Sequence, residues 1–335
     1  MQPESRNLPW LLWLFWTLAG IGLLFLVAQD EGAQLSTNTW ASLILGMAPL
    51  IGAQLTLGSP PAAQKTRAWL RTVNQPLKHT AAGIALLYLL SGLLVGGFNP
   101  YTFTIFTVGV FAALGTLRQI ERGVSGLTWA DAAVWLLLWI PFDLRWNYDL
   151  WTGPDGFAYH WWSVALSVIA VIGWYGLREL PEFGYNLVPT WRDIGITLPA
   201  FLGFFVIVVP IALGIGFITF PPTTKFTFLA LLANFAGTFL TIGIPEELFF
   251  RGVLLHGLDQ KYKDKPWLPL LLSSLAFGLM HWNNVSSLEE KIAYVALASL
   301  AGAFYGWAYR RSGNKLFSAV LLHTLVDVVW VFVFR

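Results

Sequence analysis

The sequence lacks cysteine altogether: none occurs among its 335 residues. Disulfide bonds, thiolate metal ligands and cysteine nucleophiles are therefore excluded. Charged residues are scarce as well, making up 11% of the chain against about 25% in soluble domains. The formal net charge is only +2 and no run of Lys or Arg resembles a phosphate-tracking segment, so no nucleic-acid partner is expected. The zinc-protease motif H-E-x-x-H and the P-loop are also missing.

Apolar residues dominate what is present. They account for 56% of the chain and give a mean hydropathy of +0.62. We therefore expect an all-α, polytopic integral membrane protein with about eleven transmembrane helices (9–11). The first apolar segment follows Arg6 and has no convincing small-x-small cleavage site after it, so we interpret it as an uncleaved span rather than a signal peptide. The expected spans lie at 9–28, 40–58, 80–98, 102–117, 128–142, 160–177, 196–219, 226–257, 268–282, 289–309 and 316–334.

The basic residues indicate an orientation. If eleven spans alternate across the bilayer, most of the 20 Lys and Arg residues fall on one side, and such an excess marks the cytoplasmic side. The N-terminus is therefore expected to be cytoplasmic, and the plasma (inner) membrane is the default location. The lipid bilayer is then one partner of the chain. The sequence does not determine the oligomeric state of the protein.

Helix-capping patterns and small residues support the division into spans. Thr128 with Asp131, and Thr190 with Asp193, have the spacing of capping boxes that open helices, so we interpret both acids as cap residues rather than buried carboxylates. Small residues recur at every fourth position on one face of the span 289–309, which favours close packing against a neighbouring helix. These small residues are Ala298, Gly302 and Gly306.

A domain boundary is expected in the polar loop 178–195, which contains two prolines. The region before it, 1–190, holds about six spans without a buried ionisable residue and is interpreted as an N-terminal transmembrane region of unknown role. The region after it, 191–335, holds five spans and an unusual cluster of ionisable residues.

This cluster locates the chemistry of the chain. A charged group at the centre of a membrane helix costs about 2.5–3.5 kcal/mol even on the mildest scale. Several such groups are therefore expected to face one another around a polar cavity, as in a functional site. The six residues are Glu246, Glu247, Arg251, His281, His323 and Asp327.

The span 226–257 is too long for one straight crossing, since its residues would extend about 48 Å as a helix. A break at Gly243 and Pro245 is expected, because proline removes a helix hydrogen bond. Glu246 and Glu247 would then occupy the first turn of a new helical segment, where the helix dipole favours a negative charge.

The two glutamates are expected to differ in role. Glu247 precedes Arg251 by four residues, the spacing of a helix ion pair. Glu246 projects about 100° away and stays free to act as a general base. His281 is expected at nearly the same membrane depth as Glu246, and Phe277 shares the face of His281 and is expected to wall the cavity.

His323 and Asp327 are four residues apart and project from one face of the last span. With Glu246 and His281, this pair suits water-mediated hydrolysis, in which Glu246 and His281 activate a water and the pair stabilises an oxyanion. The same four residues could instead ligate a metal ion. Alternatively, Asp327 only fixes the tautomer of His323.

At these residues the chain resembles the CPBP intramembrane proteases, the family of CAAX-processing enzymes and bacteriocin-processing or immunity proteins. The segment from Glu246 to Arg251 matches its E-E-x-x-x-R motif. Phe277 to His281 matches F-x-x-x-H, and the pair on the last span matches H-x-x-x-[N/D]. The resemblance covers about residues 191–335 and implies a protease core there.

The resemblance implies an endopeptidase that hydrolyses a peptide bond of a membrane-associated or prenylated substrate, with Zn²⁺ as a possible cofactor. It assigns catalytic roles to Glu246, His281, His323 and Asp327, which would also be the metal ligands, and supporting roles to Glu247, Arg251 and Phe277. The CAAX-processing branch typically has Asn where this chain has Asp327. Because an ionised Asp cannot donate a hydrogen bond, an oxyanion role requires a proton or a metal there.

Two other functions compete with proteolysis. A non-catalytic immunity or binding protein could keep the fold, although the motifs are intact. A proton-coupled transporter could use buried Glu and His residues as a relay, although the sequence shows no obvious inverted repeat.

Overall fold

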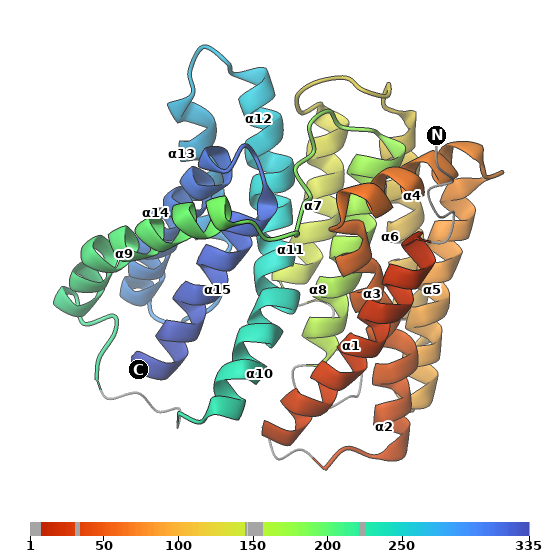
Figure 1. Cartoon of the computed structure of the whole chain (residues 1–335), viewed down its shortest axis with the longest axis horizontal. Coiled ribbons are helices and arrows are strands. Elements are labelled where there is room, and N and C mark those ends of the chain that lie inside the picture. The colour runs from red at the N-terminus through yellow and green to blue at the C-terminus, as the bar shows by residue number, and fades with distance from the viewer. Residues whose placement is uncertain (1–7, 31–33, 145, 147–156, 221–225, 335) are drawn as a thin grey trace. The chain divides into compact units, whose positions relative to one another are not determined.

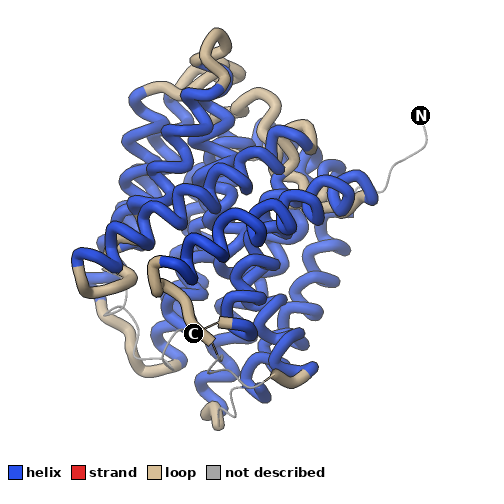
Figure 2. Tube along the Cα trace, turned by 90° about the vertical axis from the view of Figure 1, so that its left-hand side faces the viewer, coloured by secondary structure: helices blue, strands red, loops and turns tan. Residues whose placement is uncertain are grey.

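The computed structural model describes residues 8–30, 34–144, 146, 157–220 and 226–334. This part of the chain consists of helices and loops, without a strand (Figure 2). Nine of its helices are long and apolar enough to cross a membrane. The predicted all-α polytopic fold is confirmed, and the protein is an integral membrane protein. Two further expected spans are the shorter helices α7 (Trp129–Asp143) and α13 (Trp267–Leu279).

The chain divides into two compact units, which are described separately. The first contains Met1–Val124 and Thr128–Pro181, and the second contains Ser125–Leu127 and Glu182–Arg335. The division thus falls after Pro181, and the two regions 1–190 and 191–335 stay a prediction.

The first unit is a bundle of helices, coloured from red to yellow-green in Figure 1. Three of its short elements follow one another without a break and form the single apolar span Thr37–Leu57. The elements are α1 (Leu8–Asp30), α2 (Thr37–Ser42), the π-helix η1 (Leu43–Met47), α3 (Ala48–Leu57), α4 (Pro60–Thr72), α5 (Pro76–Leu94), α6 (Pro100–Gln119), α7, α8 (Phe157–Ala170) and the π-helix η3 (Val171–Leu177).

A buried ion pair connects two helices of this unit. Asp131 closes the expected capping box with Thr128, and its Oδ1 also contacts Arg178 Nε at 2.6 Å and accepts a hydrogen bond from Trp174 Nε1 at 2.9 Å. The side chains of Asp131 and Arg178 are both fully buried. The prediction that Asp131 is a cap residue is confirmed. The prediction that it is not a buried carboxylate, and that this region buries no ionisable residue, is wrong, because Arg178 packs over the helix start.

The second unit is coloured from green to blue in Figure 1. It contains one helix, Phe228–Lys261, that is much longer than the others. The elements are α9 (Trp191–Gly214), α10 (Phe228–Thr238), the π-helix η4 (Phe239–Gly243), α11 (Ile244–Glu247), the π-helix η5 (Leu248–Leu255), α12 (His256–Lys261), α13, α14 (Leu288–Arg311) and α15 (Leu316–Val333).

Small residues let α14 approach its neighbours in this unit. A Cβ atom added to Gly306 would lie 2.5 Å from Leu270 Cδ1 of α13 and 3.2 Å from Leu255 Cδ2 of η5. A Cβ atom added to Gly278 of α13 would lie 2.4 Å from the Val295 carbonyl oxygen of α14. The predicted close packing along this face is confirmed.

The N-terminal end of α9 is tied to the start of α15. Asp193 forms the expected capping box with Thr190, pairs with Lys315 and accepts a hydrogen bond from Ser318 at 3.1 Å. Asp193 is therefore a cap residue, as predicted, but the prediction that it is not a buried carboxylate is wrong, because Lys315 and Ser318 cover it. The contact fixes the entry of α15, the helix that carries His323 and Asp327.

Candidate active site

The two glutamates lie in the middle of a continuous helix. The segment Phe228–Lys261 is helical throughout, and Gly243 has ordinary right-handed helical angles (φ −59°, ψ −53°). The predicted break at Gly243 and Pro245 is wrong, because the wide π-helical turns of η4 accommodate the proline ring and its missing N–H. The favourable dipole of a new helix start is therefore absent from this position. Instead, Glu246 and Glu247 lie between two π-helical stretches, η4 and η5.

Gly243 brings α15 next to this helix. A Cβ atom added to Gly243 would lie 3.0 Å from Thr324 Oγ1 and 3.3 Å from Val320 Cγ1, both on α15. Only a residue without a side chain fits this approach without displacement of α15. Because His323 is the neighbour of Thr324 in sequence, the contact sets the distance between the glutamates and the histidine.

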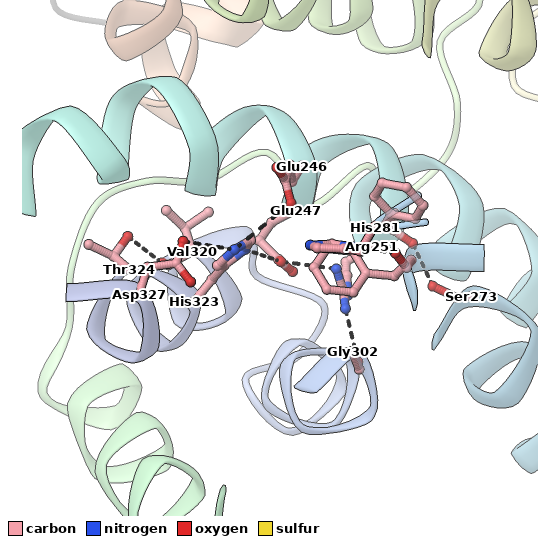
Figure 3. A network of polar contacts seen from close by, with 12 residues as sticks. Glu246, Glu247, Arg251, Ser273, His281, Gly302, Val320, His323, Thr324 and Asp327 are labelled. Atoms are coloured by element: carbon pink, nitrogen blue, oxygen red, sulfur yellow. Dashed lines mark hydrogen bonds and ion pairs between the residues drawn. The ribbon is translucent and has the colours of Figure 1, made fainter. Parts of the chain in front are cut away.

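Glu247 is fully buried and binds two partners through the same oxygen. Arg251 Nη1 lies 2.9 Å from Glu247 Oε1, as the spacing predicted, and His323 Nδ1 lies 2.8 Å from it. Arg251 also donates from Nη2 to the Gly302 carbonyl oxygen at 3.0 Å. Figure 3 shows Glu247 between the histidine and the arginine. The bond to His323 could not be read from spacing, since the two residues are far apart in sequence.

Glu246 is in a different environment from its neighbour. Its side chain is 13% exposed, and its Oε2 lies 3.9 Å from His323 Nε2. Within the described chain, no hydrogen bond to its carboxylate is found. Asp327 Oδ2 lies 3.4 Å from the same ring nitrogen, and the Asp327 side chain is 34% exposed. His323 Nε2 thus faces two carboxylates while Nδ1 is held by Glu247.

Aromatic rings enclose Arg251 and His323. The Arg251 guanidinium lies 4.4 Å from the centroid of the Phe277 ring and 5.3 Å from that of Tyr305. Tyr305 stacks on His323 with a centroid distance of 4.7 Å and an angle of 17°, and Phe277 meets His323 edge-on at 5.7 Å. These rings exclude water from the charged groups and so strengthen their mutual attraction. Tyr305 was not predicted, because only the packing of α14 against α15 brings it to the site.

His281 lies in the turn that follows α13, which ends at Leu279. Its Nδ1 lies 2.9 Å from the Phe277 carbonyl oxygen, so Nδ1 carries the proton and donates it, leaving Nε2 as an acceptor in the neutral ring. Its ring contacts those of Phe277, at 4.8 Å, and Tyr294, at 5.0 Å. Phe277 thus contacts His281 as their shared face predicted, and its role as a wall of a cavity stays a prediction. The structure gives no direct contact between His281 and Glu246, and their pairing stays a prediction.

The side chains as they stand do not form a metal site. In the described part of the chain, no group of three or more His, Cys, Asp or Glu side chains is arranged to hold an ion. His323 Nε2 and the carboxylates of Glu246 and Asp327 are the donors closest to such a set, and His281 uses Nδ1 for the Phe277 carbonyl oxygen. The prediction of Zn²⁺ stays a prediction.

One comparison with known proteins gave a match. Residues 228–329 match the family model described as type II CAAX prenyl endopeptidase Rce1-like. No curated protein and no solved structure matches the chain. The matched segment covers less than half of the chain but contains all three motifs. It confirms the resemblance to the CPBP proteases, and it supports an intramembrane protease in general terms.

Proposed function

We propose that the protein is a CAAX-type intramembrane endopeptidase that hydrolyses a peptide bond of a membrane-associated or prenylated substrate. One observation carries the proposal. Two adjacent glutamates on one helix meet one histidine of α15, and they meet it in different ways: Glu247 holds Nδ1, while Glu246 and Asp327 face Nε2. A segment that matches an endopeptidase family contains all of these residues.

Glu246 is the general base in this proposal. Its carboxylate is partly accessible and accepts no hydrogen bond from the described chain, so it can receive a proton from a water molecule. The water oxygen attacks the carbonyl carbon of the scissile bond, and the proton passes to the leaving amine as the carbon–nitrogen bond breaks. His281 presents Nε2 as an acceptor and would help to orient the water.

His323 stabilises the oxyanion in this proposal. Glu247 accepts a hydrogen bond from Nδ1–H and fixes the ring orientation, so that Nε2 faces Glu246 and Asp327, and in the doubly protonated ring Nε2–H is directed to their side. Because Asp327 is an acid rather than the usual Asn, it acts here by holding the proton on Nε2 rather than by donating its own hydrogen bond. In the alternative mechanism, Glu246, His281, His323 and Asp327 would bind a Zn²⁺ ion. These side chains would then have to come closer to one another than they are here.

The proposal also includes an orientation of the chain and a membrane in which it resides. We propose that the N-terminus is cytoplasmic and that the protein resides in the plasma (inner) membrane, on the basis of the distribution of Lys and Arg. The peptide substrate would then reach Glu246 from within or at the edge of the bilayer.

Cleavage of quenched peptides by purified protein in detergent tests the proposal. The panel contains each peptide with and without a prenylated C-terminus, and zinc content is measured on the same sample. Glu246→Gln should abolish cleavage, whereas Glu289→Gln, which removes an exposed carboxylate of the same unit, should leave it unchanged. Equal activity of wild type and Glu246→Gln would refute the mechanism.

The same samples separate the competing functions. Cleavage that requires stoichiometric zinc would favour the metal mechanism over a glutamate alone. Absence of cleavage for every peptide would favour the non-catalytic immunity or binding function. Proton flux into liposomes that depends on Glu246 would favour the transporter.

A further inference from the structure

A second charged cluster lies in the first unit, and none of its residues belongs to the proposed protease site. Arg71 of α4 donates to Glu179 Oε1 from Nε at 2.7 Å and to Oε2 from Nη2. Arg122, in the loop after α6, approaches Glu179 Oε1 with Nη1 at 3.7 Å. Arg67, one turn before Arg71, lies over the ring of Tyr175 at 4.6 Å and acts on the same carboxylate through its charge.

Backbone contacts hold these side chains together. The Gly123 N–H donates to the Arg178 carbonyl oxygen at 3.3 Å, and Arg178 Nη1 donates to the Val124 carbonyl oxygen at 3.0 Å. Both bonds dock the loop of Arg122 onto the segment of Glu179. Glu179 itself has a left-handed backbone (φ 56°), a conformation that costs a non-glycine residue energy and persists where its surroundings enforce it.

The cluster has more positive charge than its own acid neutralises. Arg71 and Arg122 both approach one carboxylate, and Arg67 acts on it through its charge. The side chains of Arg71 and Arg122 are 52% and 50% exposed. Arg71 donates to Glu179 from Nε and Nη2, so its third guanidinium nitrogen, Nη1, is not used in this pair. Planar guanidinium donors fixed in this way match the oxygens of a phosphate group.

We propose that Arg67, Arg71 and Arg122 form a binding site for a phosphate group, carried either by an anionic lipid headgroup or by free phosphate. Trp69 lies between Arg67 and Arg71 in the sequence of α4, on another face of the helix, and is 50% exposed. An exposed Trp on this helix suits a position at the level of lipid headgroups, where Trp is enriched. The site is independent of the proposed protease and does not require that activity.

The thermal unfolding midpoint, followed in a neutral detergent at constant ionic strength, tests this site. The probes are inorganic phosphate, short-chain phosphatidylglycerol and short-chain phosphatidylcholine. Arg122→Gln and Arg67→Gln should each weaken binding about tenfold, the effect of losing one charge-assisted hydrogen bond. The control Arg311→Gln removes an exposed arginine of the other unit and should bind as wild type does. Arg122→Lys keeps the charge and should retain most of the binding even if Arg122→Gln folds less well.

The outcomes identify the source of the phosphate. Stabilisation by phosphatidylglycerol that these two variants lose supports a lipid headgroup. Stabilisation by inorganic phosphate alone, with the same losses, supports a free phosphate ligand. The proposal is overturned if no probe stabilises the wild type, if phosphatidylcholine acts as strongly as phosphatidylglycerol, or if Arg311→Gln loses as much binding as Arg122→Gln.

Discussion

Replacement of Gly243 by alanine tests whether the approach of α15 sets the geometry of the site. The new Cβ atom would lie 3.0 Å from Thr324 Oγ1, 3.3 Å from Val320 Cγ1 and 3.4 Å from the Val320 carbonyl oxygen. One of these contacts is with backbone, and Thr324 Oγ1 is itself bonded to the same carbonyl at 2.8 Å. The neighbours therefore have to move by a few tenths of an ångström, and α15 moves with them.

The expected effects on stability and on activity differ in size. Overpacking costs about 1–3 kcal/mol, and the alanine returns about 0.5–1 kcal/mol because it is a better helix former than glycine. The free energy of unfolding should therefore fall only slightly, by about 0–2.5 kcal/mol. Activity should fall about fivefold to tenfold, since a displacement of 1 Å costs about a hundredfold and the shift separates His323 from Glu247, now 2.8 Å apart.

Gly237 provides a matched control on the same helix. A Cβ atom added there meets nothing within 4 Å, so Gly237→Ala should be neutral or slightly stabilising and fully active. The assay compares peptide cleavage and the thermal midpoint of both variants with wild type. The reasoning is refuted if Gly243→Ala cleaves as fast as Gly237→Ala, because α15 would then not be positioned by this contact.

Three further outcomes follow from the contacts. Glu247→Gln should reduce stability by about 3–5 kcal/mol, because it leaves the buried guanidinium beside it without a counter-charge; an unchanged denaturation midpoint would contradict the ion pair. Asp327→Asn should retain cleavage within about tenfold of wild type, because an amide can orient His323 as a carboxylate does, whereas Asp327→Leu should lose it; equal losses in a peptidase assay would show that the carboxylate charge itself is required. In the first unit, the hydrogen bonds from Arg71 lower the pKa of the Glu179 carboxyl, so its contribution to stability is complete at neutral pH and is lost as the pH falls through that lowered pKa. The thermal midpoints of Glu179→Gln and wild type should therefore differ more at pH 7 than near pH 3, and an equal difference at both values would refute this linkage.

The helices were predictable from the sequence because the bilayer imposes a length and a composition on each span. Capping boxes also gave the starts of α7 and α9, since they depend on residues three positions apart. Gly243 and Pro245 were misread for a physical reason. A proline usually interrupts a helix, but π-helical turns can absorb it, and nothing in the local sequence distinguishes the two outcomes.

The candidate site was predictable only as far as helical spacing reaches. The pairs Glu247–Arg251 and His323–Asp327 are four residues apart, so one face of one helix brings each pair together. The bond between Glu247 and His323 joins two helices and depends on their relative rotation, which spacing within one helix does not determine. Tyr305 was missed for the same reason. A tyrosine on an apolar helix face does not reveal which residue of another helix it contacts.

The surroundings of the two adjacent glutamates favour the proposed division of structural and chemical roles between them. Glu247 has no exposed surface and gives one oxygen to both Arg251 and His323, so any change in its charge would leave a buried cation unpaired. Glu246 has a little exposed surface and stands near His323 at a distance too long for a hydrogen bond, so its protonation state can change without the loss of a structural contact. A residue that must gain and lose a proton in each turnover cannot also hold the helices together. The division of these tasks between neighbouring carboxylates is therefore the physical argument for Glu246, rather than Glu247, as the base.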